Sequence, residues 1–212
     1  MNRIWLIRHG MPEYGTKESR CIGVTDLPLS SEGRAAMKRM GLRAAEQDGN
    51  FLRSALFFCS PLKRAVSSGE AFLQGASSVD LTLKDKILMQ AGGFSEVDLG
   101  SWEGLSFREI RERFPEEYRL RGADPGGYRT PGGETLEEAG QRFFKTLLQV
   151  AEETGKDLVI FGHSGAMGAG LSILEHRSAD GYKDYFKSFG GIMQLSMTDN
   201  GRIIRVDERV FI

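Results

Sequence analysis

Hydrophobic residues in this chain gather into short runs that are almost free of polar side chains. Three of these runs predict buried strands, and they cover residues 4–7, 55–59 and 158–161. A strand that faces water on one side alternates apolar and polar residues, whereas a strand covered on both faces is apolar throughout. The three runs are therefore expected to form parallel strands inside a sheet.

A helical spacing of apolar residues follows each run. Ser30 and Ser31 are suitable caps for the first helix, and Pro61 suits the first position of the second. Residues 166–174 predict a helix of small residues after the third run. A longer amphipathic helix is expected to begin near Glu134, and its apolar side carries Leu136, Ala139, Phe143, Leu147 and Val150.

Two further segments complete the predicted fold. Residues 92–133 are rich in glycine, proline and charge, with a short helix expected near 107–114. Residues 192–197 and 203–210 predict a hairpin that turns at Asp199, Asn200 and Gly201. We predict an α/β fold with a mainly parallel central sheet and helices on both faces. Residues 1–212 are expected to form a single domain, with a small cap-like insertion at about 92–133.

The balance of charge excludes two classes of protein. The 212 residues include 28 Lys and Arg against 29 Asp and Glu, a formal net charge of −1. A general nucleic-acid binder or a polybasic membrane-surface protein has a basic excess instead. No apolar stretch approaches the roughly 18 residues of a membrane span. Because Cys21 and Cys59 form no C-x-x-C pair and the first residues lack a signal-peptide pattern, we expect reduced thiols and a cytoplasmic location.

The ends of the predicted strands carry most of the candidate chemistry. Ligands of such sheets bind at the carboxyl ends of the strands, and these ends bring Arg8, His9, Arg64 and His163 to one rim. The arginines are suited to a phosphate or carboxylate, and the N–H groups after His163 open a helix. A neutral imidazole can attack phosphorus and carry it as a phosphohistidine. The rim is therefore suited to phosphoryl transfer without a metal ion.

Longer motifs surround these residues. R-H-G begins at Arg8, G-x-x-D-x-P-L-S-x-x-G at Gly23 and S-P-L-x-R-A at Ser60. E-V-D-L-G-S-W-E-G then begins at Glu96 and P-G-G-E at Pro131, ahead of the second histidine. In this order the motifs resemble those of the histidine phosphatase (phosphoglycerate mutase-like) superfamily. The sequences of these motifs are most similar to those of the alpha-ribazole phosphatases, which remove phosphate from a cobalamin-pathway intermediate.

The resemblance implies a role for each residue of the rim. His9 would be the phosphorylated nucleophile, and Arg8 and Arg64 would bind the phosphoryl oxygens. His163 would complete this pocket and stabilise the transition state. Glu96 would be the general acid for the leaving alcohol and then the base for the incoming water. An anionic substrate beside that carboxyl would help to keep it protonated.

The chain departs from the family's pattern close to the nucleophile. Family members commonly have Thr or Ser three residues after it and Asn six residues after it, where this chain has Pro12 and Gly15. The family asparagine usually contacts phosphate. We therefore expect a substitute from Tyr14, Thr16 or the backbone at Gly23, and Gly23 is a candidate phosphate-binding residue.

Other functions agree less well with the sequence. The pattern of the family's mutases is absent, which favours a phosphatase over phosphoglycerate mutase-type transfer. A catalytically inactive phospho-ligand binding module would need the arginines but not the nucleophile and the acid. A serine hydrolase elbow is suggested at 162–166, yet only His176 follows it, so we interpret Ser164 as a phosphate-binding residue instead. Three widely spaced histidines make no convincing metal site.

The sequence thus predicts a metal-independent phosphomonoesterase that acts through a phosphohistidine on a small phosphorylated metabolite, such as alpha-ribazole 5′-phosphate. No cofactor, nucleic acid or membrane is expected as a partner, and a homodimer is compatible with the sequence. Aromatic residues of the insertion are expected either to pack it onto the sheet or to contact the organic part of the substrate, and they are Phe107, Phe114, Tyr118 and Tyr128.

Overall fold

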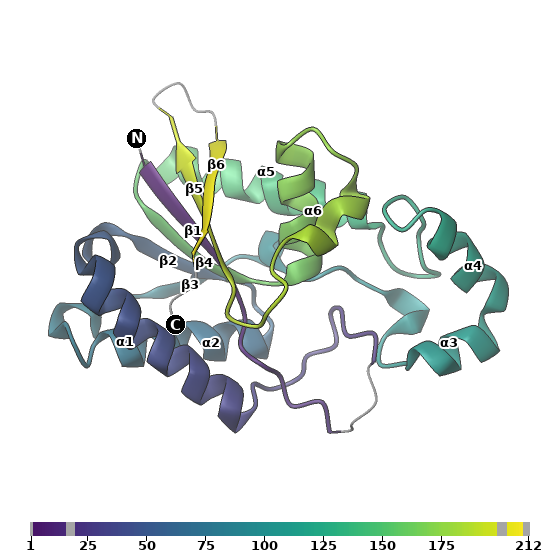
Figure 1. Ribbon diagram of the computed structural model, residues 1–212, viewed down its shortest axis with the longest axis horizontal. Coiled ribbons are helices and arrows are strands. Elements are labelled where there is room, and N and C mark those ends of the chain that lie inside the picture. Colours follow the sequence, from purple (N-terminus) through teal and green to yellow (C-terminus); the bar gives the residue numbers. More distant parts are fainter. Residues whose placement is uncertain (1, 16–19, 199–202, 210–212) are drawn as a thin grey trace.

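A mixed sheet forms the centre of the protein (Figure 1). The computed structural model describes residues 2–15, 20–198 and 203–209. Within them the sheet has six strands in the order β3-β2-β4-β1-β5-β6. Strands β3, β2, β4 and β1 run parallel, whereas β5 pairs antiparallel with both β1 and β6. The strand bounds are β1 Asn2–Arg8, β2 Leu56–Cys59, β3 Leu88–Gln90, β4 Leu158–Gly162, β5 Ile192–Met197 and β6 Ile203–Arg209.

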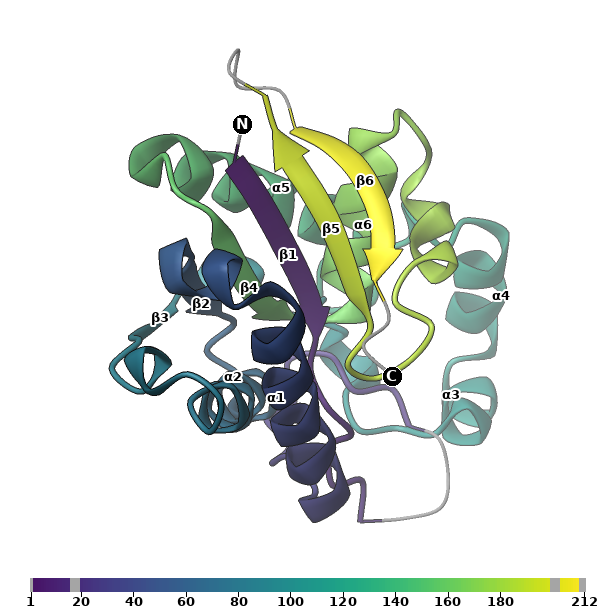
Figure 2. The same cartoon turned by 60° about the vertical axis from the view of Figure 1, so that its left-hand side comes forward.

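The three predicted apolar runs are the three inner parallel strands. Only β3 was not predicted, because its three residues are partly exposed and too few to show a pattern. The predicted hairpin is present as β5 and β6, which lie side by side at one edge (Figure 2). Its expected turn at Asp199, Asn200 and Gly201, and the predicted last residue Val210, lie outside the described residues.

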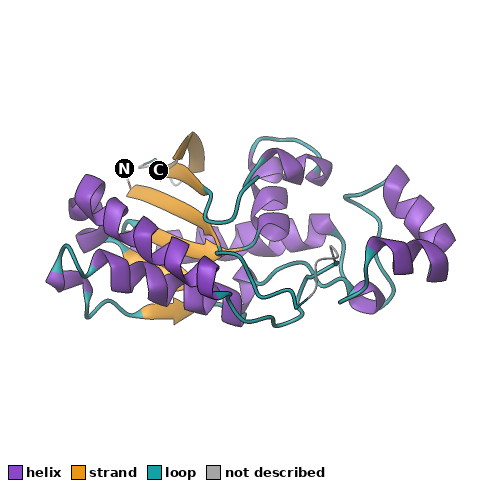
Figure 3. Ribbon diagram, turned by 60° about the horizontal axis from the view of Figure 1, so that its bottom comes forward, coloured by secondary structure: helices purple, strands orange, loops and turns teal. Residues whose placement is uncertain are grey.

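Helices cover both faces of the sheet, as the continuous apolar runs predict (Figure 3). Trp5 and Ile7 point to the face covered by α1 (Ser31–Ser54) and α2 (Lys63–Ala76). Ile4 and Leu6 point to the other face, covered by α5 (Leu136–Thr154) and α6 (Ser164–Leu174). Both sets of side chains are fully buried, so a polar residue in β1 would lose water on either face.

The helix starts follow local capping. The Ser30 hydroxyl accepts a hydrogen bond from Gly33 N and caps α1, as predicted. The expected start of α2 at Pro61 is wrong, because Ser60 Oγ accepts from Leu62 N and forms a turn, so that the helix begins at Lys63. Thr135 caps α5 in a reciprocal capping box with Glu138, which begins the helix at Leu136 rather than at Glu134.

The segment 92–133 lies beyond the carboxyl ends of the parallel strands, to the right in Figure 1. It contains two short 3-10 turns, η2 (Gly92–Phe94) and η3 (Gly100–Trp102), followed by α3 (Phe107–Arg113) and α4 (Pro115–Ala123). Only α3 was predicted. Phe114 leaves the helical conformation with φ −135° and ψ 54°, and Pro115 then starts α4 at the first helical position. The cap role of this segment and the single-domain organisation stay predictions.

Two further 3-10 turns lie outside this segment, η1 (Leu81–Leu83) and η4 (Ala179–Asp184). Among the described helices none has both the length and the apolar character needed to cross a membrane.

Candidate active site

The carboxyl ends of two neighbouring strands bring the two candidate histidines together. Arg8 ends β1 and His9 follows it, while His163 follows β4, and β1 and β4 pair directly. The N–H of His9 donates to Gly162 O over 3.0 Å, which ties the two strand ends. As a result the ring centroids of His9 and His163 lie 5.0 Å apart. Arg64 reaches the same point from the first turn of α2.

The hydrogen bonds of His9 define which ring nitrogen is free to react. Nδ1 lies 2.7 Å from Gly10 O, and because a carbonyl can only accept, Nδ1 carries the proton. Nε2 therefore keeps its lone pair, and Arg64 Nε donates to it over 3.3 Å. Burial, reinforced by Arg64 and Arg8, lowers the pKa of His9 to about 3. The imidazole is thus neutral at physiological pH and presents Nε2 as a nucleophile.

Arg64 is fixed by backbone carbonyls. The residue is 1% exposed, and its Nη1 and Nη2 donate to Thr25 O and Gly23 O over 2.8 and 2.6 Å. Ser68 fixes the adjacent backbone, because its Oγ accepts from Gly10 N and donates to Arg64 O. This buried guanidinium donates to neutral carbonyls and forms no ion pair with a described carboxylate, which favours an anionic ligand beside His9.

Arg8 and His163 contribute buried polar atoms that have no partner among the described residues. Arg8 Nη1 donates to Phe186 O over 2.9 Å, and its guanidinium lies 4.1 Å from the centre of the Phe189 ring. Its Nε and both ring nitrogens of His163 are buried with no hydrogen-bond partner among the described residues. Burial, with Arg64, lowers the pKa of His163 well below its usual value. Buried polar groups without partners are costly, so these atoms point to a ligand with several acceptors.

Glu96 is buried rather than solvated. The residue is 9% exposed, and its carboxylate accepts hydrogen bonds from the backbone N–H groups of Gly165, Ala166 and Val97 at 3.0, 2.8 and 2.9 Å. Gly165 and Ala166 lie in the first turn of α6, the helix that His163 precedes. A Cβ on Gly165 would lie 2.5 Å from Glu96 Oε1, so glycine is needed for this close approach. The structure thereby fixes Glu96 beside His163.

A second set of contacts holds the backbone on either side of Glu96. Arg142 on α5 donates to the carbonyls of Gly93, Ser95 and Glu96 at 2.9, 3.1 and 3.3 Å. The same guanidinium donates to the carboxylate of Glu134 over 2.6 Å, and Glu134 also accepts from Asp98 N. Because α5 packs on α6, these bonds fix the loop relative to the histidine pair. The E-V-D and P-G-G-E motifs are therefore joined through Arg142.

Gly23 has a different environment from the predicted one. Its N–H donates to Glu103, and its carbonyl accepts from Arg64, so its hydrogen bonds orient the arginine. Glu103 also accepts from the backbone N–H groups of Val24, Thr25 and Leu99 at 2.8, 3.0 and 3.1 Å. A Cβ on Gly23 would lie 2.1 Å from a backbone oxygen, which excludes any other residue without movement. Direct phosphate binding by Gly23 stays a prediction.

The residues proposed to replace the family asparagine are only partly described. Tyr14 is exposed, and partial burial of its hydroxyl raises the pKa of that group while Arg8 and Arg64 act in the opposite direction. Gly15 has a φ of 67°, and Pro12 forms an isolated bridge with Leu29. Thr16 lies outside the described residues. Which of these groups replaces the family asparagine stays a prediction.

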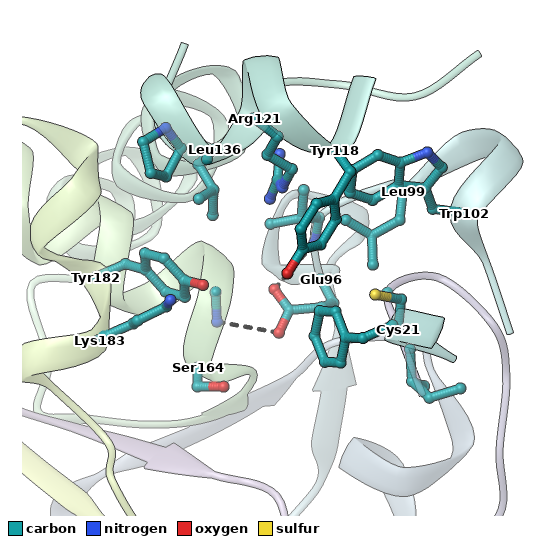
Figure 4. A pocket seen from close by; sticks show the side chains of 17 residues that line it. Cys21, Glu96, Leu99, Trp102, Tyr118, Arg121, Leu136, Ser164, Tyr182 and Lys183 are labelled. Carbon is teal, nitrogen blue, oxygen red and sulfur yellow. Dashed lines mark hydrogen bonds between the residues drawn. The ribbon is translucent and has the colours of Figure 1, made fainter. Parts of the chain in front are cut away.

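A cavity of about 470 Å³ adjoins this centre (Figure 4). Its lining includes Glu96, Gly23 and the two residues that follow His163, Ser164 and Gly165, together with residues from η3, α3, α4, α5, η4 and the intervening loops. Ser164 is the first residue of α6, so its position agrees with a role in binding at the cavity floor. Two of the four aromatic residues predicted to contact a substrate, Phe107 and Tyr118, line the cavity.

The other two aromatic residues are placed differently. Phe114 packs against the small core around Trp102, and Tyr128 lies 6.5 Å from the Trp102 ring. His176 is exposed, as expected for a residue outside the site. Among the described residues no group of three or more His, Cys, Asp or Glu is arranged to hold a metal ion.

A family model confirms the resemblance. The model of the histidine phosphatase superfamily (branch 1) matches residues 4–207. The chain belongs to this superfamily. It is 29% identical over 177 residues to 6-phosphofructo-2-kinase/fructose-2,6-bisphosphatase 3 of Rattus norvegicus, a match that covers 84% of this histidine phosphatase and 28% of the rat protein. The chain therefore spans less than a third of that relative.

Solved structures confirm the predicted fold. The alpha-ribazole phosphatase of Shigella flexneri has a TM-score of 0.77 at 20% identity, covering 96% of this histidine phosphatase and 94% of the other chain. A phosphoserine phosphatase mutant of Entamoeba histolytica, solved with phosphoserine, has a TM-score of 0.77 at 20% identity, with coverage of 98% and 96%. At 20% identity, the similarity to these two structures shows a shared fold and nothing about the substrate.

Two residues of the site were missed as functional candidates. Glu103 and Arg142 have no ligand-facing role, and each acts through backbone groups of a loop that is distant in sequence. Glu103 stands inside a quoted motif, which is the only signal that pointed to it. Arg142 lies on the predicted amphipathic helix, where a charged residue is most simply interpreted as part of a solvated face.

We expect Glu103→Gln to reduce both stability and turnover of this histidine phosphatase. Each carboxylate oxygen accepts from two of the four backbone N–H groups, so an amide group in place of either oxygen leaves two of them without an acceptor, at a cost of about 1–3 kcal/mol for each. If the backbone at Gly23 and Thr25 shifts, Arg64 also loses the two carbonyls that fix its guanidinium. Thermal unfolding and phosphate-release assays check this, with Glu116→Gln on the exposed face of α4 as the matched control. Unchanged activity in the Glu103 variant would contradict the positioning role.

Proposed function

We propose that the protein is a phosphomonoesterase that works through a phosphohistidine at His9. The observation that carries this proposal is the neutral His9 ring, whose Nε2 keeps its lone pair beside Arg64 while Nδ1 is bonded to Gly10 O. A module that only binds phosphate would have no use for a nucleophilic nitrogen oriented in this way. The family membership and the cluster of arginines support the same reaction.

In the first half of the reaction, His9 Nε2 attacks the phosphorus of the ester. An N–P bond forms and the P–O bond to the alcohol breaks. Arg64 moves its Nε hydrogen bond from His9 to a phosphoryl oxygen, and Arg8 and His163 donate to the others, which spreads the charge of the transferring group. The leaving oxygen takes its proton from Glu96, so that an alcohol departs rather than an alkoxide.

In the second half, water attacks the phosphohistidine. The Glu96 carboxylate takes a proton from the water as its oxygen bonds to phosphorus, and the N–P bond breaks to return the electron pair to His9 Nε2. Inorganic phosphate leaves. The helix N-terminus at Gly165 and Ala166 stabilises Glu96 while it is a carboxylate, which suits the base role in this step.

The natural substrate we propose is a small phosphorylated metabolite. Alpha-ribazole 5′-phosphate is one candidate, supported by the motif wording and by the likeness in fold to the enzyme of Shigella flexneri. A cytoplasmic location and a homodimeric state stay predictions.

The direct test is hydrolysis of para-nitrophenyl phosphate in excess EDTA. Because guanidinium groups supply the positive charge at the phosphoryl site, we expect chelation to leave the rate unchanged within about twofold. The measurement is the release of para-nitrophenol before and after EDTA treatment, with readdition of Mg²⁺, Mn²⁺ or Zn²⁺ as a control. Loss of activity that a metal restores would overturn the metal-independent scheme.

A further inference from the structure

The cavity beside Glu96 has a definite chemical character. Its walls include aromatic and aliphatic side chains, among them Leu99, Trp102 and Tyr118. A volume of about 470 Å³ falls within the range of about 300–1,000 Å³ typical of small-molecule pockets, which is more than a phosphoryl group needs. Since Glu96 and Ser164 line one side, the cavity is placed to receive the alcohol part of the phosphomonoester.

Two cations line this cavity from different elements. Arg121 projects from α4 and Lys183 from η4, and both side chains are drawn around the opening in Figure 4. Arg121 donates to Tyr128 O over 3.3 Å, and its guanidinium lies 5.9 Å from the Trp102 ring. Lys183 is exposed, with Nζ 5.6 Å from the centre of the Tyr182 ring. Within the described part of the chain, neither forms an ion pair with a carboxylate.

The acid on the cavity wall does not balance these charges. Glu96 is the single acidic residue among the described residues that line the cavity, and both of its carboxylate oxygens accept backbone N–H bonds. Two other arginines of residues 92–133 are paired, Arg119 with Glu116 and Arg129 with Glu138. Arg121 and Lys183 differ from these two in having no described carboxylate within ion-pair distance.

We propose that the substrate carries a second anionic group on its alcohol part, a carboxylate or a second phosphate, which Arg121 and Lys183 bind. The apolar part of the alcohol lies against Trp102 and Tyr118. This inference rests on the proposed function, and it narrows the substrate class to phosphomonoesters with two anionic ends, a class that does not include alpha-ribazole 5′-phosphate. Arg121, which can donate two parallel hydrogen bonds, contributes more than the exposed Lys183.

Three aryl phosphates test the proposal. They carry a carboxymethyl, a phosphonomethyl or a carbamoylmethyl group in the para position, and the methylene keeps the acidity of the leaving phenols similar. The carbamoyl compound is the uncharged match of the carboxylate. We expect wild type to prefer at least one of the anionic compounds over the amide by about tenfold in kcat/KM, as for a charge-assisted hydrogen bond. The favoured compound identifies the carboxylate or the phosphate as the second group.

Variants then assign the preference to the two cations. Arg121→Gln is expected to remove most of the kcat/KM preference for the anionic compound, and Lys183→Gln to reduce this preference about threefold. Arg119→Gln, on the same helix as Arg121, should leave the preference unchanged. Equal kcat/KM for all three compounds in wild type, or a preference that survives both substitutions, would overturn the inference while leaving the phosphatase intact. Failure to hydrolyse any of the three would instead count against the proposed function.

Discussion

Replacing His9 by alanine is expected to abolish phosphate release, with a loss of about 10⁴-fold or more in kcat. His163 is not expected to replace it, because His163 donates an N–H to a phosphoryl oxygen in the proposed reaction and no described backbone carbonyl fixes which of its ring nitrogens is bare. The variant should remain folded, since α1, α2, α5 and α6 pack on the sheet without His9. Phosphate release and thermal unfolding measure the two effects, with His176→Ala as the control.

The same centre predicts a trapped intermediate. Wild type mixed with labelled substrate and quenched rapidly should carry an acid-labile, alkali-stable phosphoryl group, the stability expected of phosphohistidine. Peptide mapping should place it at His9, and the His9→Ala protein should carry none. A label at Ser164, which opens α6 in a position resembling a nucleophile elbow, would overturn the assignment.

Replacing Glu96 by glutamine is expected to slow substrates with poor leaving groups by about 10²–10⁴-fold, the usual contribution of a general acid. The rate of para-nitrophenyl phosphate hydrolysis should fall far less, because para-nitrophenolate leaves without being protonated. The measurement is the dependence of kcat/KM on the acidity of the leaving alcohol, which should become steeper in the variant. Equal losses on both kinds of substrate would contradict the acid role.

The contacts of Glu96 define a control for this experiment. In glutamine, the amide group replaces one oxygen and would face a backbone N–H at the start of α6, where two donors meet. The variant is therefore expected to be less stable. A structural change of this kind lowers kcat/KM by the same factor for all substrates, whereas loss of the acid does not. Glu137→Gln, in the exposed first turn of α5, provides the matched carboxylate substitution outside the site.

The sheet and the histidine pair were predictable because they depend on local patterns. An apolar run of four or five residues indicates a strand covered on both faces, and the rule that ligands bind at the carboxyl ends of strands then brings His9, Arg64 and His163 together. These relations need no knowledge of packing between distant segments. Ser30 as a helix cap is predictable for the same reason, since its effect spans one turn.

The loops around the site follow from packing, which the sequence pattern does not display. From residue types alone Glu96 resembles a solvated loop carboxylate, and only the family motif assigns it a role. Its burial depends on two backbone N–H groups of α6 and on the close approach that Gly165 allows. Glu103 and Arg142 act on backbone groups of segments far away in sequence, so no periodicity records them. Helix α4 was missed because the break at Phe114 is a backbone feature and not a change in composition.

The anchoring of Glu96 has a consequence for how such an enzyme diversifies. Although Glu96 belongs by chain order to the segment that contains α3 and α4, its carboxylate is held by α6 and its backbone by α5. The two short helices can therefore be altered while Glu96, the proposed proton donor, keeps its position at the start of α6. We expect substitutions in this one peripheral segment to change which substrates are accepted and to leave the proposed phosphoryl-transfer residues in place.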